Sequence, residues 1–271
     1  MERDRGEHEG VAARLVPAMS SGAQRLRDMH RGPQPLILPN VWDPVSARAF
    51  ADAGFAALAT SSSAVAATLG YDDGQTPAAE MFAAVARIAR SVPVPVTADI
   101  ENGYGLAPGE LVATLAECGV VGCNLEDSDP AQGTLTDPDR QADFLAAVRA
   151  EAGQDLVVNA RVDVFIRPPA GDSGADPAAL VDAAVARASR YLAAGADCTY
   201  PIVAPEAALP ELVRRIGGPV NAMHQRNGLT LAELGATGVA RITFGGGLHR
   251  RAETELRASA TALAATAGAK A

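Results

Sequence analysis

The feature that most constrains the fold is a regular alternation of short apolar runs with alanine-rich helical segments. The runs are apolar almost throughout, which is typical of parallel strands covered on both faces. The predicted strands are Leu36–Pro39, Ala56–Thr60, Val94–Ala98, Gly122–Leu125, Leu156–Ala160, Asp197–Tyr200, Pro219–Ala222 and Val239–Thr243. Eight β-α units in succession predict an α/β fold, a (β/α)8 TIM-type barrel, with an open doubly wound sheet as the alternative.

The helical segments indicate how the chain is organised. The predicted helices after the first strand are Val45–Ala53, Ala64–Leu69, Ala78–Ser91, Pro108–Cys118, Asp139–Ala152, Pro177–Ala194, Pro205–Ile216, Leu229–Leu234 and Leu248–Ala265. Residues 1–31 are polar and arginine-rich, and we expect an arm followed by an N-terminal helix there. Residues 32–271 are predicted to form a single barrel domain, because no linker divides them. The stretch Arg167–Asp176 is predicted to be a loop insertion.

Charge and composition exclude several classes of function. The net charge of −9 argues against a nucleic-acid-binding protein, which needs clustered positive charge. No window is apolar enough to span a membrane, and the N-terminus lacks the apolar region of a secretion signal, so a cytoplasmic location is expected. The only lysine is Lys270, which leaves no plausible nucleophile for Schiff-base chemistry. The cysteines Cys118, Cys123 and Cys198 form no CxxC pair and are expected to be reduced.

Polar residues collect where the predicted strands end, which is the active-site face of such a barrel. Asp99 and Glu101 are two residues apart on a segment expected to be extended, so their side chains should point the same way. Glu126 follows the neighbouring strand. Three carboxylates that repel one another favour a hard divalent cation, and the absence of nearby His or Cys favours Mg²⁺, or Mn²⁺, over zinc. The alternative is a set of solvated loop acids.

Other polar groups at the same face have two interpretations each. Arg161 could clamp a substrate anion, form an ion pair with Glu126 or Asp99, or do both. Residues 61–63, all serine, could donate to an anion at a helix N-terminus or cap that helix. The glycines at 245–247 could cradle an anion, although a tight turn is the preferred interpretation. His224 is predicted to be a loop histidine.

Together these residues resemble the isocitrate lyase/phosphoenolpyruvate mutase superfamily. The resemblance runs from about Pro39 to Leu248, and each motif follows its own predicted strand. The motifs are Ser61–Ser63 leading to Leu69-Gly70-Tyr71-Asp72-Asp73, then Asp99-x-Glu101-x-Gly103-Tyr104-Gly105, Leu125-Glu126-Asp127 and Ala160-Arg161.

The resemblance implies a Mg²⁺-dependent enzyme that handles 2-oxo acids through an enolate. By carry-over, Asp99 would bind the metal directly, and Asp73, Glu101 and Glu126 would act through its waters. It also places Arg161, Asp73 and Glu126 in the catalytic machinery. The substrate-binding residues that it implies are Ser61, Ser62, Ser63, Arg161 and Asn221. Members of the superfamily form tetramers in which the last helix is exchanged between paired subunits, so a homo-oligomer, a tetramer or a dimer, is expected.

Two departures from the superfamily bear on the substrate. The lyases carry a Lys-x-Cys-Gly-His loop after strand four, but here the residues from Asp127 to Thr136 contain no Cys, Lys or His, and the Lys and Asn/Thr-Ser pair of the mutases is also missing. After strand six, Ile202 stands where the lyases have Glu and the mutase has His. We therefore expect a lyase that cleaves a C–C bond of a small 2-oxo or 2-hydroxy di- or tricarboxylate. The alternatives are a phosphonate C–P mutase or hydrolase, and a barrel that binds an oxo-acid without turnover.

Overall fold

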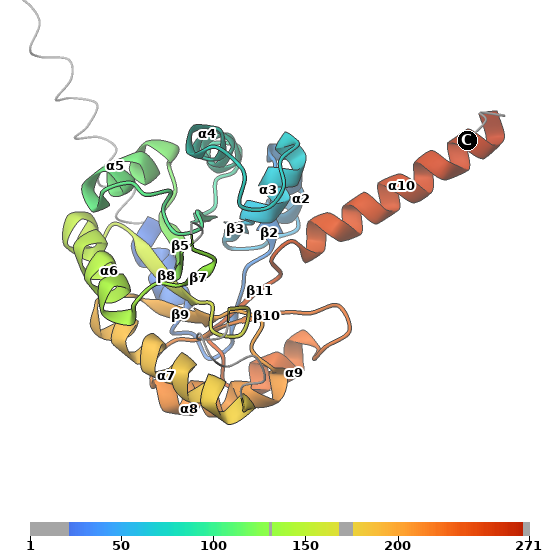
Figure 1. The fold of residues 1–271 in the computed structure, drawn as a ribbon. Coiled ribbons are helices and arrows are strands. Elements are labelled where there is room, and N and C mark those ends of the chain that lie inside the picture. Colours follow the sequence, from blue (N-terminus) through green and yellow to red (C-terminus); the bar gives the residue numbers. More distant parts are fainter. Residues whose placement is uncertain (1–21, 130–131, 168–175, 268–271) are drawn as a thin grey trace, which may run out of the picture.

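The chain folds into a closed barrel of parallel strands surrounded by helices (Figure 1). The computed structural model describes residues 22–129, 132–167 and 176–267. The barrel strands are β1 (Leu36–Ile37) with β2 (Asn40–Val41), β3 (Leu58–Thr60), β4 (Val96–Asp99), β5 (Gly122–Glu126), β8 (Val157–Val162), β9 (Cys198–Pro201), β10 (Asn221–Met223) and β11 (Arg241–Thr243).

The barrel closes through the first strand, which pairs with a neighbour on each side. β1 pairs with β11, and β2, just beyond Pro39, pairs with β3. The remaining strands pair in chain order, and a parallel bridge between Thr199 and Val220 joins β9 to β10. All of these pairings are parallel, so the carboxyl ends of the strands meet at one mouth. The structure thus confirms the predicted barrel and the position of each predicted strand.

Helices follow the strands, and all but the last cover the outside of the barrel. The covering helices are α2 (Pro44–Asp52), α3 (Ser62–Leu69), α4 (Ala78–Ala89), α5 (Pro108–Cys118), α6 (Pro138–Ala152), α7 (Pro177–Ala193), α8 (Leu209–Ile216) after the short helix η1 (Glu206–Ala208) and α9 (Leu231–Ala236), and the last helix is α10 (Gly247–Ala267). The apolar faces of the covering helices pack on the strands in one continuous core. No helix in the described ranges is both long and apolar enough to span a membrane.

The other end of the barrel is closed by a helical segment over residues 22–29. Leu26 from this segment is fully buried, and a Cβ atom on Gly22 would lie 2.9 Å from Val121 Cγ1. A Cβ atom on Gly122 in β5 would lie 3.0 Å from Leu26 Cδ2 and 2.9 Å from Thr97 Oγ1. Glycine at 122 therefore allows the helical segment to sit directly against the barrel interior.

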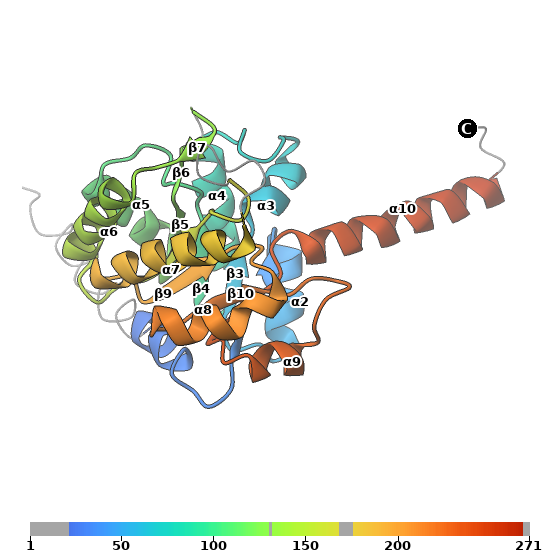
Figure 2. The same cartoon turned by 60° about the horizontal axis from the view of Figure 1, so that its bottom comes forward.

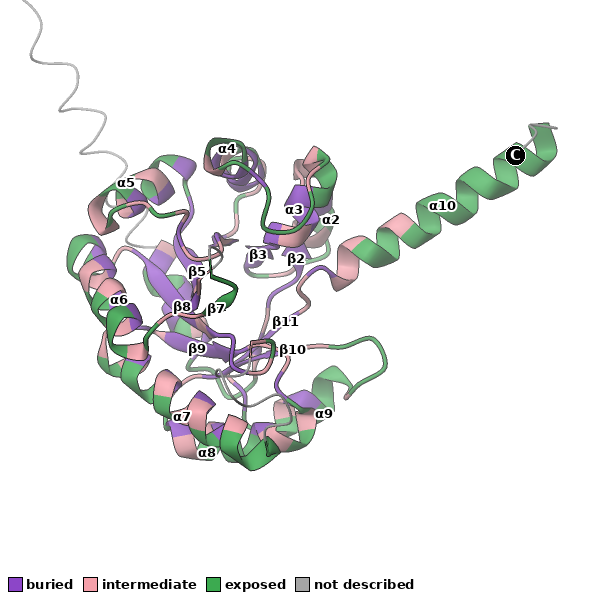
Figure 3. Ribbon diagram, viewed as in Figure 1, coloured by how far each residue is buried: buried purple, intermediate pink, exposed green. Residues whose placement is uncertain are grey.

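The last helix, α10, projects away from the barrel into solvent (Figures 1 and 2). None of its residues, from Gly247 to Ala267, is buried, as the coloring in Figure 3 shows. Two leucines seven residues apart on this helix, Leu256 and Leu263, are 70% and 69% exposed. A helix of this length with no tertiary cover leaves apolar side chains available to a partner.

The structure differs from the sequence expectation in two places near the mouth. β4 ends at Asp99, so the segment through Glu101 is a turn and not the expected extended strand. Glu101 has a φ of 53°, in the left-handed region, so the two-residue alternation of a strand does not apply to it. The loop after β5 contains an antiparallel hairpin of β6 (Ser128–Asp129) and β7 (Thr134–Leu135), which was not predicted. Of the predicted insertion Arg167–Asp176, residues 168–175 lie outside the described residues.

Candidate active site

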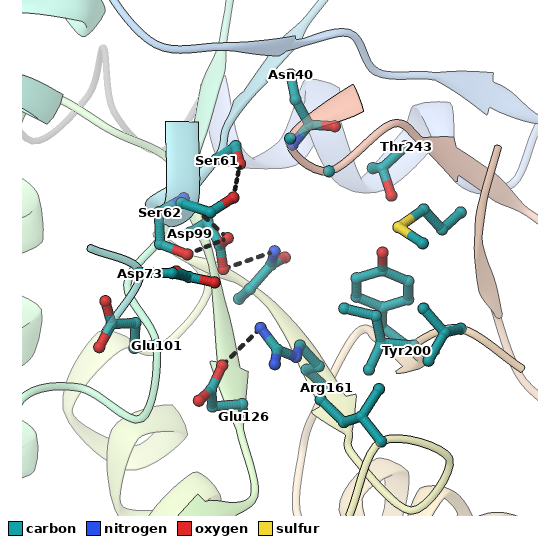
Figure 4. A pocket seen from close by; sticks show the side chains of 18 of the residues that line it. Asn40, Ser61, Ser62, Asp73, Asp99, Glu101, Glu126, Arg161, Tyr200 and Thr243 are labelled. Atoms are coloured by element: carbon teal, nitrogen blue, oxygen red, sulfur yellow. Dashed lines mark hydrogen bonds and ion pairs between the residues drawn. The ribbon is translucent and has the colours of Figure 1, made fainter. Parts of the chain in front are cut away.

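A cavity of about 380 Å³ opens at the carboxyl ends of the barrel strands. Its wall contains most of the residues that the sequence singled out, and Figure 4 shows Ser61, Ser62, Asp73 and Asp99 close together, with Glu126 and Arg161 paired nearby and Glu101 farther out. The sequence-predicted residues that line it are Ser61, Ser62, Ser63, Asp73, Asp99, Glu101, Glu126 and Arg161. The structure therefore brings these residues into one site.

Asp99 lies at the end of β4 and is held by hydrogen bonds on both carboxylate oxygens. The Ser62 amide and hydroxyl both donate to Oδ2, at 3.1 and 2.9 Å, and the Asn124 amide donates to Oδ1 at 3.2 Å. Its own amide donates to Thr60 Oγ1 at 2.8 Å. Three donors to one carboxylate fix its orientation. Ser62 thus contacts Asp99, a role that the serine triplet did not reveal in the sequence.

Arg161, on β8, lies between two carboxylates. Its Nη1 is 2.6 Å from Glu126 Oε2, so the ion pair considered from the sequence is present. Its Nε and Nη2 also donate to Asp163, at 2.6 and 2.9 Å. Burial raises the pKa of Glu126, and the adjacent guanidinium offsets part of that rise. Arg161 is therefore already engaged at three nitrogen atoms.

Two further carboxylates lie on the same side of the cavity. Asp73 lies beside Asp99 in Figure 4, with Glu101 farther out. Desolvation in the pocket and the nearby Asp99 charge raise the pKa of Asp73, and desolvation also raises the pKa of Glu101. Glu101 Oε1 is buried without a hydrogen-bond partner in the described part of the chain. Asp73 and Glu101 therefore add negative charge to the cluster without forming an ion pair among the described residues, whereas Glu126 is paired with Arg161.

The donor atoms of this cluster are of the kind that a hard divalent cation prefers. The oxygens of four carboxylates line one wall, and such ligands suit Mg²⁺ better than zinc. Among the described residues, no three Asp, Glu, His or Cys side chains converge closely enough to form a complete metal-binding group. Mg²⁺ usually keeps several waters and binds few protein carboxylates directly. The residues fit a site in which one carboxylate binds directly and its neighbours act through water.

The serines at the start of α3 line the same cavity next to Asp99, to which Ser62 donates. Ser61 is the N-cap of α3, and its Oγ accepts from the Ala64 amide at 3.4 Å. The Ser61 and Ser63 hydroxyls lie 3.1 Å apart. The Arg250 side chain is close by, since a Cβ atom on Gly246 would be 2.7 Å from its Nη1 and 3.0 Å from Ser63 Oγ. Ser61 can therefore cap α3 while the hydroxyl groups at this helix end remain able to bind an anion.

Comparison with known proteins shows to which family this chain belongs. The protein-family model described as phosphoenolpyruvate phosphomutase matches residues 26–264 of this chain. The chain belongs to the phosphoenolpyruvate phosphomutase family. It is 34% identical to an uncharacterized protein of Mycobacterium tuberculosis over 219 residues, which are 80% of each chain.

Two further relatives carry names that suggest a reaction. A probable 2-methylisocitrate lyase of Corynebacterium glutamicum is 33% identical over 175 residues, 60% of this chain and 53% of that one. The crystal structure of a protein from Burkholderia cenocepacia J2315, assigned as a phosphonomutase, superposes with a TM-score of 0.81 and 42% identity. That match covers 89% of this chain and 99% of the other. The resemblance stated from the motifs is thereby confirmed.

The loop after β5, which departs from the lyase pattern of the family, is attached firmly to the barrel. Asp127 is fully buried and accepts from the Asp163 amide at 2.8 Å, Tyr191 Oη at 2.7 Å and Arg187 Nη1 at 2.9 Å. The Ser128 hydroxyl donates to Asp163. Asp127 and Asp163 thus hold the hairpin in place, and the sequence had given Asp127 only as part of a motif.

Three residues of the site differ from the sequence expectation. Asn221 is fully buried, accepts from Thr243 Oγ1 at 3.2 Å and is not part of the cavity wall. Arg167 and Arg250 line the cavity but were not predicted. Arg250 follows the glycine turn at 245–247 and lies one helical turn into α10. This position after the last strand could have marked it in the sequence as a residue of the cavity. Arg167 lies in a segment without periodicity, so no sequence signal marked it.

The cysteines lie away from the cavity wall, as expected from the sequence. Cys123 is inside β5 and Cys198 begins β9, and burial raises the pKa of each thiol to about 12. Cys118 ends α5, and its thiol contacts the Phe82 carbonyl oxygen at 3.4 Å. Burial raises its pKa as well. A thiol with a raised pKa is a poor nucleophile near neutral pH.

Proposed function

We propose that this protein is a Mg²⁺-dependent lyase that cleaves a C–C bond of a small 2-oxo or 2-hydroxy di- or tricarboxylate through an enolate. One observation carries the proposal: a single cavity joins the carboxylate cluster around Asp99 to the serine-capped N-terminus of α3. The relationship to a probable 2-methylisocitrate lyase supports C–C cleavage within the family.

In this proposal the carboxylate cluster holds the metal. Asp99 would bind it directly, and Asp73, Glu101 and Glu126 would act through its waters. The bound ion would supply a positive charge that stabilises the enolate oxygen. Ser62 would act as a positioning residue, because its two hydrogen bonds to Asp99 Oδ2 hold the carboxylate in one orientation.

The remaining residues would bind and orient the substrate. The hydroxyls of Ser61 and Ser63 at the start of α3 would donate to the substrate carboxylate, since the Ser62 amide already donates to Asp99. Arg161 would stabilise negative charge as it develops during cleavage, since Glu126 and Asp163 keep its guanidinium fixed. These groups are preorganised, so little reorientation would be needed during the reaction.

Proton exchange at the methyl group of pyruvate tests the proposal. An enzyme that forms the enolate of a 2-oxo acid should exchange these protons for deuterium in D₂O when Mg²⁺ is present, and proton NMR measures the loss of signal. Removal of Mg²⁺ with a chelator is the control. No exchange above the buffer rate would contradict an enolising enzyme and would favour the alternative of a barrel that binds an oxo-acid without turnover.

A phosphonate C–P mutase or hydrolase is a second candidate, because the structure assigned as a phosphonomutase shares 42% identity with this chain. Both reactions could use the same metal site and serine-capped helix. A panel of 2-oxo acids, 2-hydroxy acids and phosphonates separates them. Release of pyruvate, glyoxylate or oxalate indicates C–C cleavage, whereas a phosphonate isomer or inorganic phosphate indicates C–P chemistry.

We expect negligible activity with isocitrate and methylisocitrate. Cleavage of these substrates needs a general acid, and the loss of such a group typically lowers the rate about 10²–10⁴-fold. The hairpin Ser128–Leu135 lacks the family's cysteine, and the described thiols are buried. Lyase assays before and after iodoacetamide treatment measure this. Methylisocitrate cleavage that iodoacetamide abolishes would contradict it.

We expect α10 to mediate assembly of a homo-oligomer. Its residues are not buried in the single chain, and Leu256 and Leu263 are exposed on it. Deletion of the residues after Leu248 should lower the oligomeric state in sedimentation velocity. The double variant Leu256→Gln, Leu263→Gln should weaken the same association while keeping the helix. A full-length chain that sediments as a monomer would contradict this expectation.

A further inference from the structure

The three arginines that line the cavity differ in their partners. Arg161 contacts Glu126 and Asp163 through three nitrogen atoms, so its planar fork is not free for a second bidentate partner. Arg250 lies beside Ser63, at the serine wall of the cavity. Neither therefore offers a free guanidinium away from the serines.

Arg167 is held in a different way. Its Nε donates to Ser128 Oγ at 2.9 Å, and its Nη1 donates to the Gly133 carbonyl at 3.1 Å. Both partners are neutral oxygens, and no carboxylate of the described residues lies within ion-pair distance of this guanidinium. Ser128 in turn donates to Asp163, so the Arg167 side chain is oriented by the barrel. Arg167 therefore presents an oriented positive charge without a described counter-ion.

The wall beside Arg167 is aliphatic. It consists of Ile166, Ile202, Val203 and Met223, which come from the ends of β8, β9 and β10. Val203 has a φ of 49°, and its turn is closed by the Ala204 amide, which donates to the Pro201 carbonyl at 3.3 Å. Glycine is usual at such a position, and a β-branched residue there is strained. Strain of this kind at a ligand cavity points to a requirement for the side chain.

We propose that Arg167 binds the second carboxylate of a dicarboxylate, and that the aliphatic carbons of this substrate pack on Ile202, Val203 and Met223. The inference rests on the proposed function, which assigns the first carboxylate to the serine wall. It narrows the substrate class from di- or tricarboxylates to dicarboxylates, with alkyl substituents preferred. A third carboxylate against the aliphatic wall would be desolvated, with the neutral hydroxyls of Tyr200 and Thr243 as the polar groups that line the cavity from β9 and β11.

Isothermal titration calorimetry in the presence of Mg²⁺ tests the proposed subsite, because it measures the binding affinity of each ligand and does not depend on catalytic turnover. Pyruvate serves as the probe with one carboxylate, malate and 2,3-dimethylmalate as dicarboxylates, and isocitrate as a tricarboxylate. The wild-type protein should bind the dicarboxylates at least tenfold more tightly than pyruvate or isocitrate. Arg167→Gln should reduce that advantage over pyruvate to less than threefold. The exposed Arg140→Gln, outside this cavity, is the matched control and should keep the advantage.

A second variant tests the aliphatic wall. Ile202→Gln should remove the preference for 2,3-dimethylmalate over malate and leave the pyruvate affinity within twofold. An Arg167→Gln protein that keeps the dicarboxylate advantage, or an Ile202→Gln protein that keeps the methyl preference, would overturn the inference. These binding results can be told apart from those of the pyruvate proton-exchange experiment. If the wild-type protein exchanges the pyruvate protons but Arg167→Gln keeps the wild-type binding preferences, only this subsite is refuted. If the wild-type protein does not exchange the protons, the enolising function is refuted.

Discussion

Replacement of Asp99 by Asn should reduce Mg²⁺ affinity by at least about 100-fold while the barrel remains folded. Asn has nearly the same shape as Asp but lacks the charge that holds a hard cation. Its amide would face the donors of Ser62 or Asn124, so a moderate loss of stability, about 1–3 kcal/mol, is expected too. Calorimetric titration with Mg²⁺ gives the affinity, and circular dichroism reports the fold.

Asp72→Asn is the matched control for this variant, because Asp72 is an exposed carboxylate near the same loop and does not line the cavity. It removes the same net charge from the protein. If both variants bind Mg²⁺ as tightly as the wild type, Asp99 is not the metal ligand.

Replacement of Asp127 by Ala should lower the free energy of unfolding by about 3–5 kcal/mol, because it leaves the charge of Arg187 without its buried partner. The Asp163 amide and the Tyr191 hydroxyl would lose their acceptor as well. Urea denaturation measures the effect. Tyr191→Phe, which removes one donor to Asp127 and one acceptor of Arg187 Nη1 but leaves the ion pair, should cost less, about 1–3 kcal/mol.

A double variant, Asp127→Ala with Arg187→Met, separates the buried charge from the rest of the network. It should recover part of the stability, because no unpaired guanidinium remains. A single Asp127→Ala variant that unfolds within 1 kcal/mol of the wild type would show that the hairpin does not depend on this carboxylate.

The barrel itself could be predicted from the sequence because its physical signal is strong. Parallel strands covered on both faces must be apolar, and each predicted strand overlaps an observed one. The hairpin β6–β7 was missed because its strands are two residues long, too short to carry a periodic signal. Strand β2 was also missed, because the predicted first strand ended at Pro39 and the next residue, Asn40, is polar.

The site could be predicted as a set of residues but not as a set of contacts. Arg161 is on β8 and Asp163 directly follows the last residue of that strand, so a spacing of two in an extended run would have suggested this pair. By contrast, which of the three serines faces Asp99 depends on how β3 lies against β4 and on where α3 begins. Arg167 reaches the cavity only through tertiary contacts to Ser128 and Gly133.

The exposed helix α10 has a consequence for experiments on dilute protein. Its 21 residues correspond to roughly 32 Å of helix, at about 1.5 Å per residue. Helices that lack tertiary packing are only marginally stable in water, so their helix–coil equilibrium depends on temperature. If a partner covers α10, dilution should lower the temperature at which helical ellipticity is first lost, while the barrel melts later in a separate, cooperative step.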